Sequence, residues 1–178
     1  MGCSDCVFEV EARSVKVFIN GCKNVRLSLR GKIITHTLEL YKCEDCAIDI
    51  GTKVWTAQLD LCKRCRLEFA SREDFQTIIS AGCHEVKIRL ADMAESVGSA
   101  SVDFGALKTE AEAAGRTVSE ERTQWKTHFR ECPAFSFSLA LSYPAAAAGS
   151  GSLMTEQVVR LENGFPTTGE PHAKLVSW

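Results

Sequence analysis

The feature that most constrains the fold is a five-fold internal repeat in the first half of the chain. Each copy starts with a cysteine and follows the pattern Cys-x-x-(Cys or Val)-x-Φ-x-Φ, in which Φ is apolar. The leading residues are Cys3, Cys22, Cys43, Cys62 and Cys83, so successive copies begin 19, 21, 19 and 21 residues apart. Self-similarity at a nearly constant spacing is the signature of a protein that stacks its repeats.

Within each copy the apolar residues alternate with polar ones, which is the period of a strand with one buried face. A second alternating segment precedes each later cysteine, at residues 15–19, 38–40, 55–59 and 76–79. Two short strands in about 20 residues leave no room for a helix, and they bury their apolar face only by stacking. The sequence therefore predicts an all-β fold: a right-handed parallel β-helix of short coils with C-terminal closing strands.

The cysteines of the repeat have two interpretations. Three copies contain Cys-x-x-Cys, a spacing that zinc sites use. The fourth position of the repeat is Cys in three copies and Val in two, however, which indicates a small buried apolar slot. We favour the second interpretation and expect a ladder of inward-facing free thiols, with no metal and no other cofactor. Because no motif places His36, His84, His128 or His172 beside a nucleophile, we expect no catalytic residues and no enzyme activity.

Charge and hydropathy narrow the choice of partner. The net charge of −2 gives no overall basic field, so we expect no nucleic-acid partner. No apolar run reaches the roughly 18 residues of a membrane span, and Cys6 stands where a myristoylation signal prefers Ser or Thr. We therefore expect no membrane partner. The N-terminus lacks the profile of a secretory signal, so a cytoplasmic location is expected.

If the Φ positions point inward, the alternate residues point outward in columns. One column reads Val7, Arg26, Ala47, Arg66 and Lys87, and Arg89 lies in the next one. Like charges stacked at strand spacing repel unless a partner neutralises them. We predict that Arg26, Arg66, Lys87 and Arg89 bind an acidic protein surface. The alternative is a solvated face whose charges the neighbouring column offsets.

The second half divides differently. We expect coils over residues 1–91, a connector over 92–133 with a short helix at 107–114, closing strands within 134–161, and a tail over 162–178. An Ala-rich stretch at 144–152 separates the two expected strands, 135–143 and 153–161. Strands outside the coils need an edge to pair with, so we predict strand exchange with a second copy. The expected dimerisation residues are Phe135, Phe137, Leu139, Leu141, Val158 and Leu161.

Three segments carry a family resemblance. They are VKVFINGCKNVRLSLRGK at 15–32, TLEL at 37–40 followed by Cys43-Glu-Asp-Cys46, and QWKTHF at 124–129 ahead of LMTE at 153–156. In these the chain resembles the C-terminal domain of cyclase-associated protein, in the superfamily shared with tubulin-folding cofactor C. The resemblance implies a cytoskeleton-associated homodimer that binds monomeric actin, promotes nucleotide exchange on it and increases filament turnover.

The sibling branch of that superfamily implies an alternative. Its members activate GTPases with an arginine finger, which stabilises the charge of the transferring phosphoryl group. In this chain the corresponding position is Gln58, with Asp60 close by. The alternative function is thus a cofactor C-like GTPase-activating or small G-protein-binding domain that lacks an evident finger.

Overall fold

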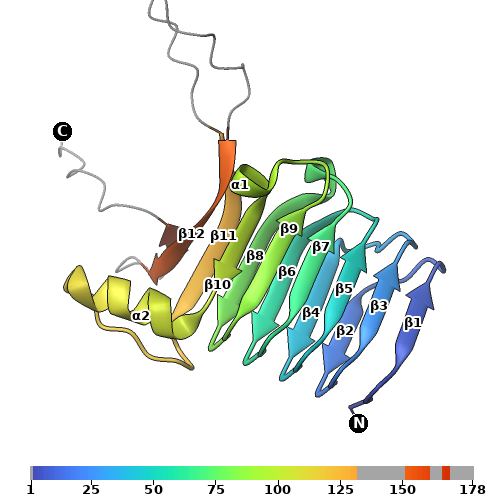
Figure 1. Ribbon diagram of the computed structural model, residues 1–178, viewed down its shortest axis with the longest axis horizontal. Coiled ribbons are helices and arrows are strands. Elements are labelled where there is room, and N and C mark those ends of the chain that lie inside the picture. The colour runs from blue at the N-terminus through green and yellow to red at the C-terminus, as the bar shows by residue number, and fades with distance from the viewer. Residues whose placement is uncertain (1, 132–150, 161–165, 169–178) are drawn as a thin grey trace, which may run out of the picture.

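The first half of the chain winds into a parallel β-solenoid (Figure 1). The computed structural model describes residues 2–131, 151–160 and 166–168. The Cys-led copies form β1 (Val7–Val10), β3 (Arg26–Leu29), β5 (Ala47–Ile50), β7 (Arg66–Phe69) and β9 (Val86–Leu90). The segments between them form β2 (Val17–Asn20), β4 (Thr37–Tyr41), β6 (Val54–Asp60) and β8 (Phe75–Ala81). A solenoid of about four turns, as the repeat predicted, is therefore confirmed.

Two sheets run along the solenoid. In the first sheet β1, β3, β5, β7 and β9 pair in parallel, and β10 (Ser99–Val102) pairs antiparallel with β9. In the second sheet β2, β4, β6 and β8 are parallel, and three antiparallel strands extend it: β11 (Gln124–Glu131), β12 (Gly151–Arg160) and β13 (Pro166–Thr168). The closing strands thus continue one sheet of the solenoid, beyond its last coil (Figure 1).

The core consists of rows of side chains that repeat from coil to coil. One row pairs Leu27, Ile48, Leu67 and Ile88, and the next pairs Leu29, Ile50, Phe69 and Leu90. All eight side chains are buried. Each buried aliphatic or aromatic side chain stabilises the fold by about 1.5–3 kcal/mol relative to exposure, so the alternating pattern fixes both the inward face and the register.

Each coil turns at residues with left-handed backbone geometry. The third residue of every copy has a positive φ of 50–55°, at positions Asp5, Asn24, Asp45, Arg64 and Glu85. The residue before each later leading cysteine is also left-handed, at Gly21, Lys42, Leu61 and Gly82. Gly, Asn and Asp adopt this geometry readily, whereas Arg and Glu do so at a cost. Equivalent turn residues in successive coils therefore share the same backbone conformation, just as equivalent strand residues share the same orientation.

The segment expected to be a connector contains more structure than the sequence indicated. Its helix is α2 (Phe104–Ala113), which begins where the Asp103 carboxylate accepts a hydrogen bond from the Ala106 amide. The short helix α1 (Glu95–Gly98) and strands β10 and β11 also lie in it. β10 reads Ser-Ala-Ser-Val, in which Val102 is the only large apolar residue, so its sequence is a weak strand signal; the strand pairs with the free edge of β9. In the described part of the chain, no helix is long and apolar enough to cross a bilayer.

Candidate functional site

The predicted thiol ladder is present in the core. Six thiols are buried: Cys22, Cys43, Cys46, Cys62, Cys65 and Cys83. Buried thiols donate weak hydrogen bonds to carbonyl oxygens of the preceding coil, as from Cys62 to Leu40 and from Cys83 to Leu59, with Sγ–O distances of 3.6 and 3.4 Å. Cys3 and Cys6 lie in the first coil and are less covered. The inward packing predicted for the repeat cysteines is confirmed for the six buried thiols, whereas Cys3 is exposed.

The thiols of the ladder differ in pKa: it is raised at Cys62 and Cys65, whereas hydrogen bonds from the Cys43 and Cys65 thiols lower the pKa of Cys46 to about 3. Hydrogen bonding to the Cys43 and Cys65 thiols, together with burial, raises the pKa of Cys62. The thiol of Cys46 and then burial raise the pKa of Cys65 to about 12. Metal ligands and nucleophiles are thiolates, so the protonated Cys62 and Cys65 suit packing. Among the described residues, no group of three or more His, Cys, Asp or Glu side chains is arranged to hold a metal ion.

The first sheet carries the predicted basic column on its outer face. The strand register places Arg26, Ala47, Arg66 and Lys87 directly beside one another on β3, β5, β7 and β9. Arg26, Arg66 and Lys87 are exposed. Arg66 lies 3.9 Å from the Glu68 carboxylate, while Arg26 and Lys87 have no salt bridge within the described residues. The neighbouring column thus offsets the positive charge only in part, and the face remains basic.

Strand β10 turns one end of this column into a shallow depression. The depression has a volume of about 490 Å³ and is lined by Arg66, Glu68, Lys87, Ile88, Arg89, Glu95, Ser99, Ala100 and Ser101. Arg89 lies between Glu68 and Ser99 in the strand register. Its Nη1 atom is buried and has no hydrogen-bond partner among the described residues. The predicted residues Arg66, Lys87 and Arg89 are therefore brought together, and Arg26 lies two strands away on the same face.

The serines and Glu95 of this depression were not among the predicted site residues. They come from α1 and β10, whose position depends on tertiary pairing with β9. The only available signal was the run of small and polar residues at 93–101, which is typical of a loop. The depression combines two guanidinium groups, one ammonium group and hydroxyl donors with the two carboxylates of Glu68 and Glu95, so cations outnumber anions in its lining by one.

Gln58, at the position of the arginine finger in the alternative function, lies on the second sheet. Its side-chain amide donates to the Asp60 carboxylate over 2.8 Å. Glu39 and Ile79 flank it on the neighbouring strands. A carboxylate at this place repels a γ-phosphate instead of stabilising its negative charge. The geometry around Gln58 therefore does not favour GTPase activation.

Of the residues predicted for dimerisation, Val158 lies in the described part of β12. It is half-buried and pairs with Thr168 of β13. Phe135, Phe137, Leu139, Leu141 and Leu161 lie outside the described residues, as does the expected strand at 135–143. β12 pairs with β11 of the same chain along its length: Gln157 lies opposite Trp125 at one end, and Gly151 lies opposite Glu131 at the other. It therefore has an edge within its own chain, so its pairing alone does not call for a second copy.

The fold and its outward columns define a class of protein: a β-solenoid with rows of equivalent side chains on its outer faces. A family model described as adenylate cyclase associated (CAP) C terminal matches residues 1–103. The match covers more than half of the 178 residues, and the chain belongs to this family, as the resemblance indicated. The family is associated with actin-monomer binding and is generally non-catalytic. A search of curated proteins finds no match.

Proposed function

We propose that this protein binds monomeric actin through the basic column of its first sheet and promotes nucleotide exchange on actin. The observation that carries the proposal is the in-register column of Arg26, Arg66 and Lys87 in a member of the adenylate cyclase associated C-terminal family. Arg66 and Lys87 lie on adjacent strands, and Arg26 lies beyond Ala47 on the same face, so the column forms a positive strip interrupted once. Such a strip attracts an acidic protein surface and fixes its register.

The orphaned guanidinium of Arg89 supports the same surface. A buried donor without a partner costs free energy, and a carboxylate in the depression removes that cost. The hydroxyls of Ser99 and Ser101 add donors on the β10 side. We propose that a carboxylate of the partner occupies this depression and that the cations of the column contact the surrounding acidic surface.

The direct test is the release of labelled nucleotide from ADP-actin monomers in excess ATP. The protein is expected to accelerate release, and the double variant Arg26→Glu/Arg66→Glu to weaken actin binding at least about ten-fold through charge repulsion. The matched control is Lys108→Glu/Arg122→Glu, which makes the same change at exposed cations away from the sheet. Absence of both binding and acceleration by the unaltered protein would refute the function.

We further propose that the protein acts as a cytoplasmic homodimer assembled through the closing strands. Met154 and Val159 on β12 are 36% and 41% exposed, and β13, at the edge of the sheet, is only three residues long. Apolar side chains beside a short edge strand suit a symmetric contact. Light scattering is expected to give twice the monomer mass, and Val159→Glu to give the monomer. A monomer before any substitution would exclude this assembly.

A further inference from the structure

One edge of the solenoid presents a row of exposed apolar side chains. Two come from the turns that lead into β2 and β4, one from the start of β6, and one from β2 itself. Val15, Ile34 and Trp55 are 65%, 43% and 52% exposed, and Phe18 is 57% exposed. Backbone hydrogen bonds stack these turns: the Thr35 amide donates to the Val15 carbonyl over 3.1 Å, and the Trp55 amide donates to the His36 carbonyl over 2.9 Å. We call these four apolar residues the Trp55 ridge.

The indole of the ridge is held in a fixed orientation. The His36 imidazole stacks on it with ring centroids 4.4 Å apart and an angle of 15° between the planes. His36 has a positive φ of 52°, because its coil contains two more residues than its neighbours between Ile33 and Leu38. The chain therefore uses an irregular turn to brace a half-exposed tryptophan, although burial of the ring would be worth several kilocalories per mole.

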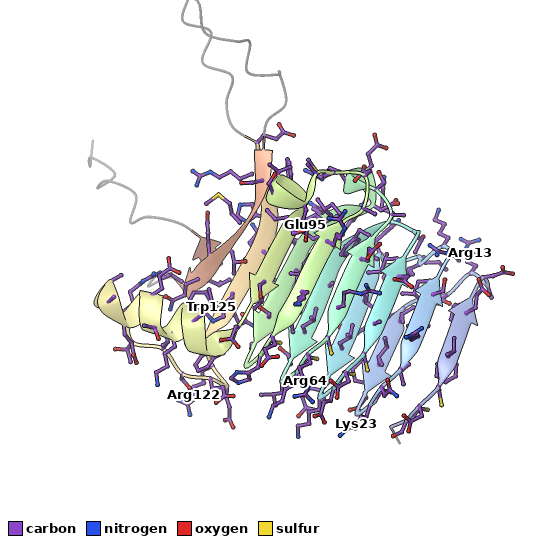
Figure 2. All side chains as sticks on the ribbon, viewed as in Figure 1. Arg13, Lys23, Arg64, Glu95, Arg122 and Trp125 are labelled. Atoms are coloured by element: carbon purple, nitrogen blue, oxygen red, sulfur yellow. The ribbon has the colours of Figure 1, made fainter. Side chains whose placement is uncertain are left out.

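Three cations lie along the ridge. Arg13, Lys32 and Lys53 are exposed, and each directly precedes a buried or half-buried residue, namely Ser14, Ile33 and Val54. None of the three has a salt bridge within the described residues, whereas Lys16 is paired with Glu39 at 2.7 Å. In the next coil the equivalent residue before Phe75 is Asp74, so the cationic row ends there. Arg13 marks this edge in Figure 2, opposite the edge that carries Lys23 and Arg64.

We propose that the Trp55 ridge is a peripheral binding surface for an anionic lipid bilayer. Tryptophan and aliphatic side chains insert at the boundary between headgroups and acyl chains, and unpaired Lys and Arg side chains beside them reach anionic headgroups. The exposed apolar side chains and the three cations beside them match the acyl and headgroup layers of such a bilayer.

This inference departs from the sequence expectation that no membrane partner exists. Hydropathy detects continuous apolar runs, and the ridge draws its residues from three coils that are 19 to 21 residues apart. Only stacking brings them together. The ridge also lies apart from the basic column on the first sheet, so the two surfaces are tested separately.

The experiment is co-sedimentation of the full chain with sucrose-loaded vesicles in 0.1 M salt. At this ionic strength the Debye length is about 10 Å, so only charges close to the membrane contribute. Vesicles of phosphatidylcholine with about 30% phosphatidylserine are expected to bind at least about ten-fold more strongly than pure phosphatidylcholine. The double variant Lys32→Glu/Lys53→Glu is expected to lose at least about 25-fold in partition constant, roughly five-fold for each charge removed. Trp55→Ala is expected to weaken binding about ten-fold.

The matched control is Arg26→Glu/Arg66→Glu, which changes the same charge on the first sheet and is expected to alter partitioning less than about three-fold. A blue shift of tryptophan emission on adding anionic vesicles, absent in Trp55→Phe, is the second readout. Circular dichroism verifies that each variant is folded. Lack of binding to anionic vesicles overturns the proposal, even if an acidic protein or a second copy binds the ridge. Equal losses in the two double variants also overturn it, whatever the outcome of the actin assay.

Discussion

The thiol of Cys65 donates to the carbonyl oxygen of Cys43 in the preceding coil, over an Sγ–O distance of 3.5 Å. The two cysteines belong to different Cys-x-x-Cys pairs, and this contact runs along the solenoid axis. Val25 and Val86 occupy the same position of the repeat as Cys65, and both are buried. The pair spacing that suggested zinc is therefore a consequence of two neighbouring packing columns.

Replacing a thiol of that column by valine is expected to change stability little. Cys65→Val conserves volume and apolar character, so the free energy of unfolding should fall by less than about 1.5 kcal/mol. Urea denaturation measures it, with Cys65→Asp as the disruptive control. A chelator should leave the unfolding midpoint of the unaltered protein unchanged. A loss of several kilocalories per mole in Cys65→Val, accompanied by released zinc, would restore the metal interpretation.

Glu85 is strained by its left-handed backbone, with φ at 51°. Asn24 occupies the equivalent position three coils away and adopts this geometry at lower cost. Glu85→Asn is therefore expected to raise the free energy of unfolding by about 0.5–1 kcal/mol. The control is Glu121→Asn, at an exposed position without a positive φ. Equal changes in the two variants would mean that backbone strain at residue 85 is not relieved.

Gly31 is required by close backbone approach. A Cβ at this residue would lie 2.1 Å from the Ala12 carbonyl oxygen and 2.7 Å from that of Glu11, both of which are backbone atoms. Gly31→Ala is expected to destabilise the fold by about 1–3 kcal/mol, because the first coil has to shift. Gly105→Ala in α2 serves as the control, since its Cβ meets only the flexible Asp103 side chain at 3.2 Å. Thermal unfolding of the two variants compares them.

His128 gives the stability a dependence on pH. Burial lowers its pKa from the ordinary 6.5, against the opposing effect of Glu156. Its Nδ1 atom is buried without a hydrogen-bond partner among the described residues. The folded state therefore disfavours the charged imidazole. Stability is fully present above pH 6.5 and decreases as the pH falls through the lower pKa of the folded state.

In His128→Gln that decrease should be reduced between pH 7 and pH 5. The measurement is the denaturation midpoint at several pH values, with His36→Gln as a control at a partly exposed imidazole. If both variants retain the full pH dependence of the unaltered protein, His128 is not its source.

Arg64 links two coils, and its contacts with two carboxylates give the stability a second dependence on pH, in the acidic range. It forms hydrogen bonds of 2.7 and 2.9 Å to Asp45 and also bonds Glu44. These contacts lower the pKa of both carboxylates from their ordinary 3.8 and 4.5. Their stabilising effect is present above those values and is lost as the pH falls through the lower folded-state values.

Arg64→Met should therefore unfold slightly more easily than the unaltered protein at pH 7 and low salt, with the difference vanishing toward pH 3 or in 1 M salt. Lys63→Met, at a neighbouring cation without a salt bridge in the described part of the chain, is the control. A difference that persists at pH 3 would point to lost packing instead of lost charge.

The accuracy of the sequence prediction follows from how each element is stabilised. Residues such as Leu67 and Ile88 alternate with polar ones because the solenoid buries one face of every strand, so the repeat specified strands, register and outward columns. β10 carries no such pattern and forms because β9 leaves an edge free. The depression at Arg89 depends on β10, and the Trp55 ridge depends on stacking of separate turns. Both were therefore beyond inference from local patterns.

The in-register stacking of β3, β5 and β7 also bears on how such a domain changes over evolution. Each of these coils contacts mainly the coils on either side of it, through equivalent positions. Removing or duplicating one whole coil would therefore preserve every type of contact while changing the length of the molecule by about one strand spacing, near 4.8 Å. The number of coils therefore sets the distance between any ligand bound near β1 and the closing strands at the far end.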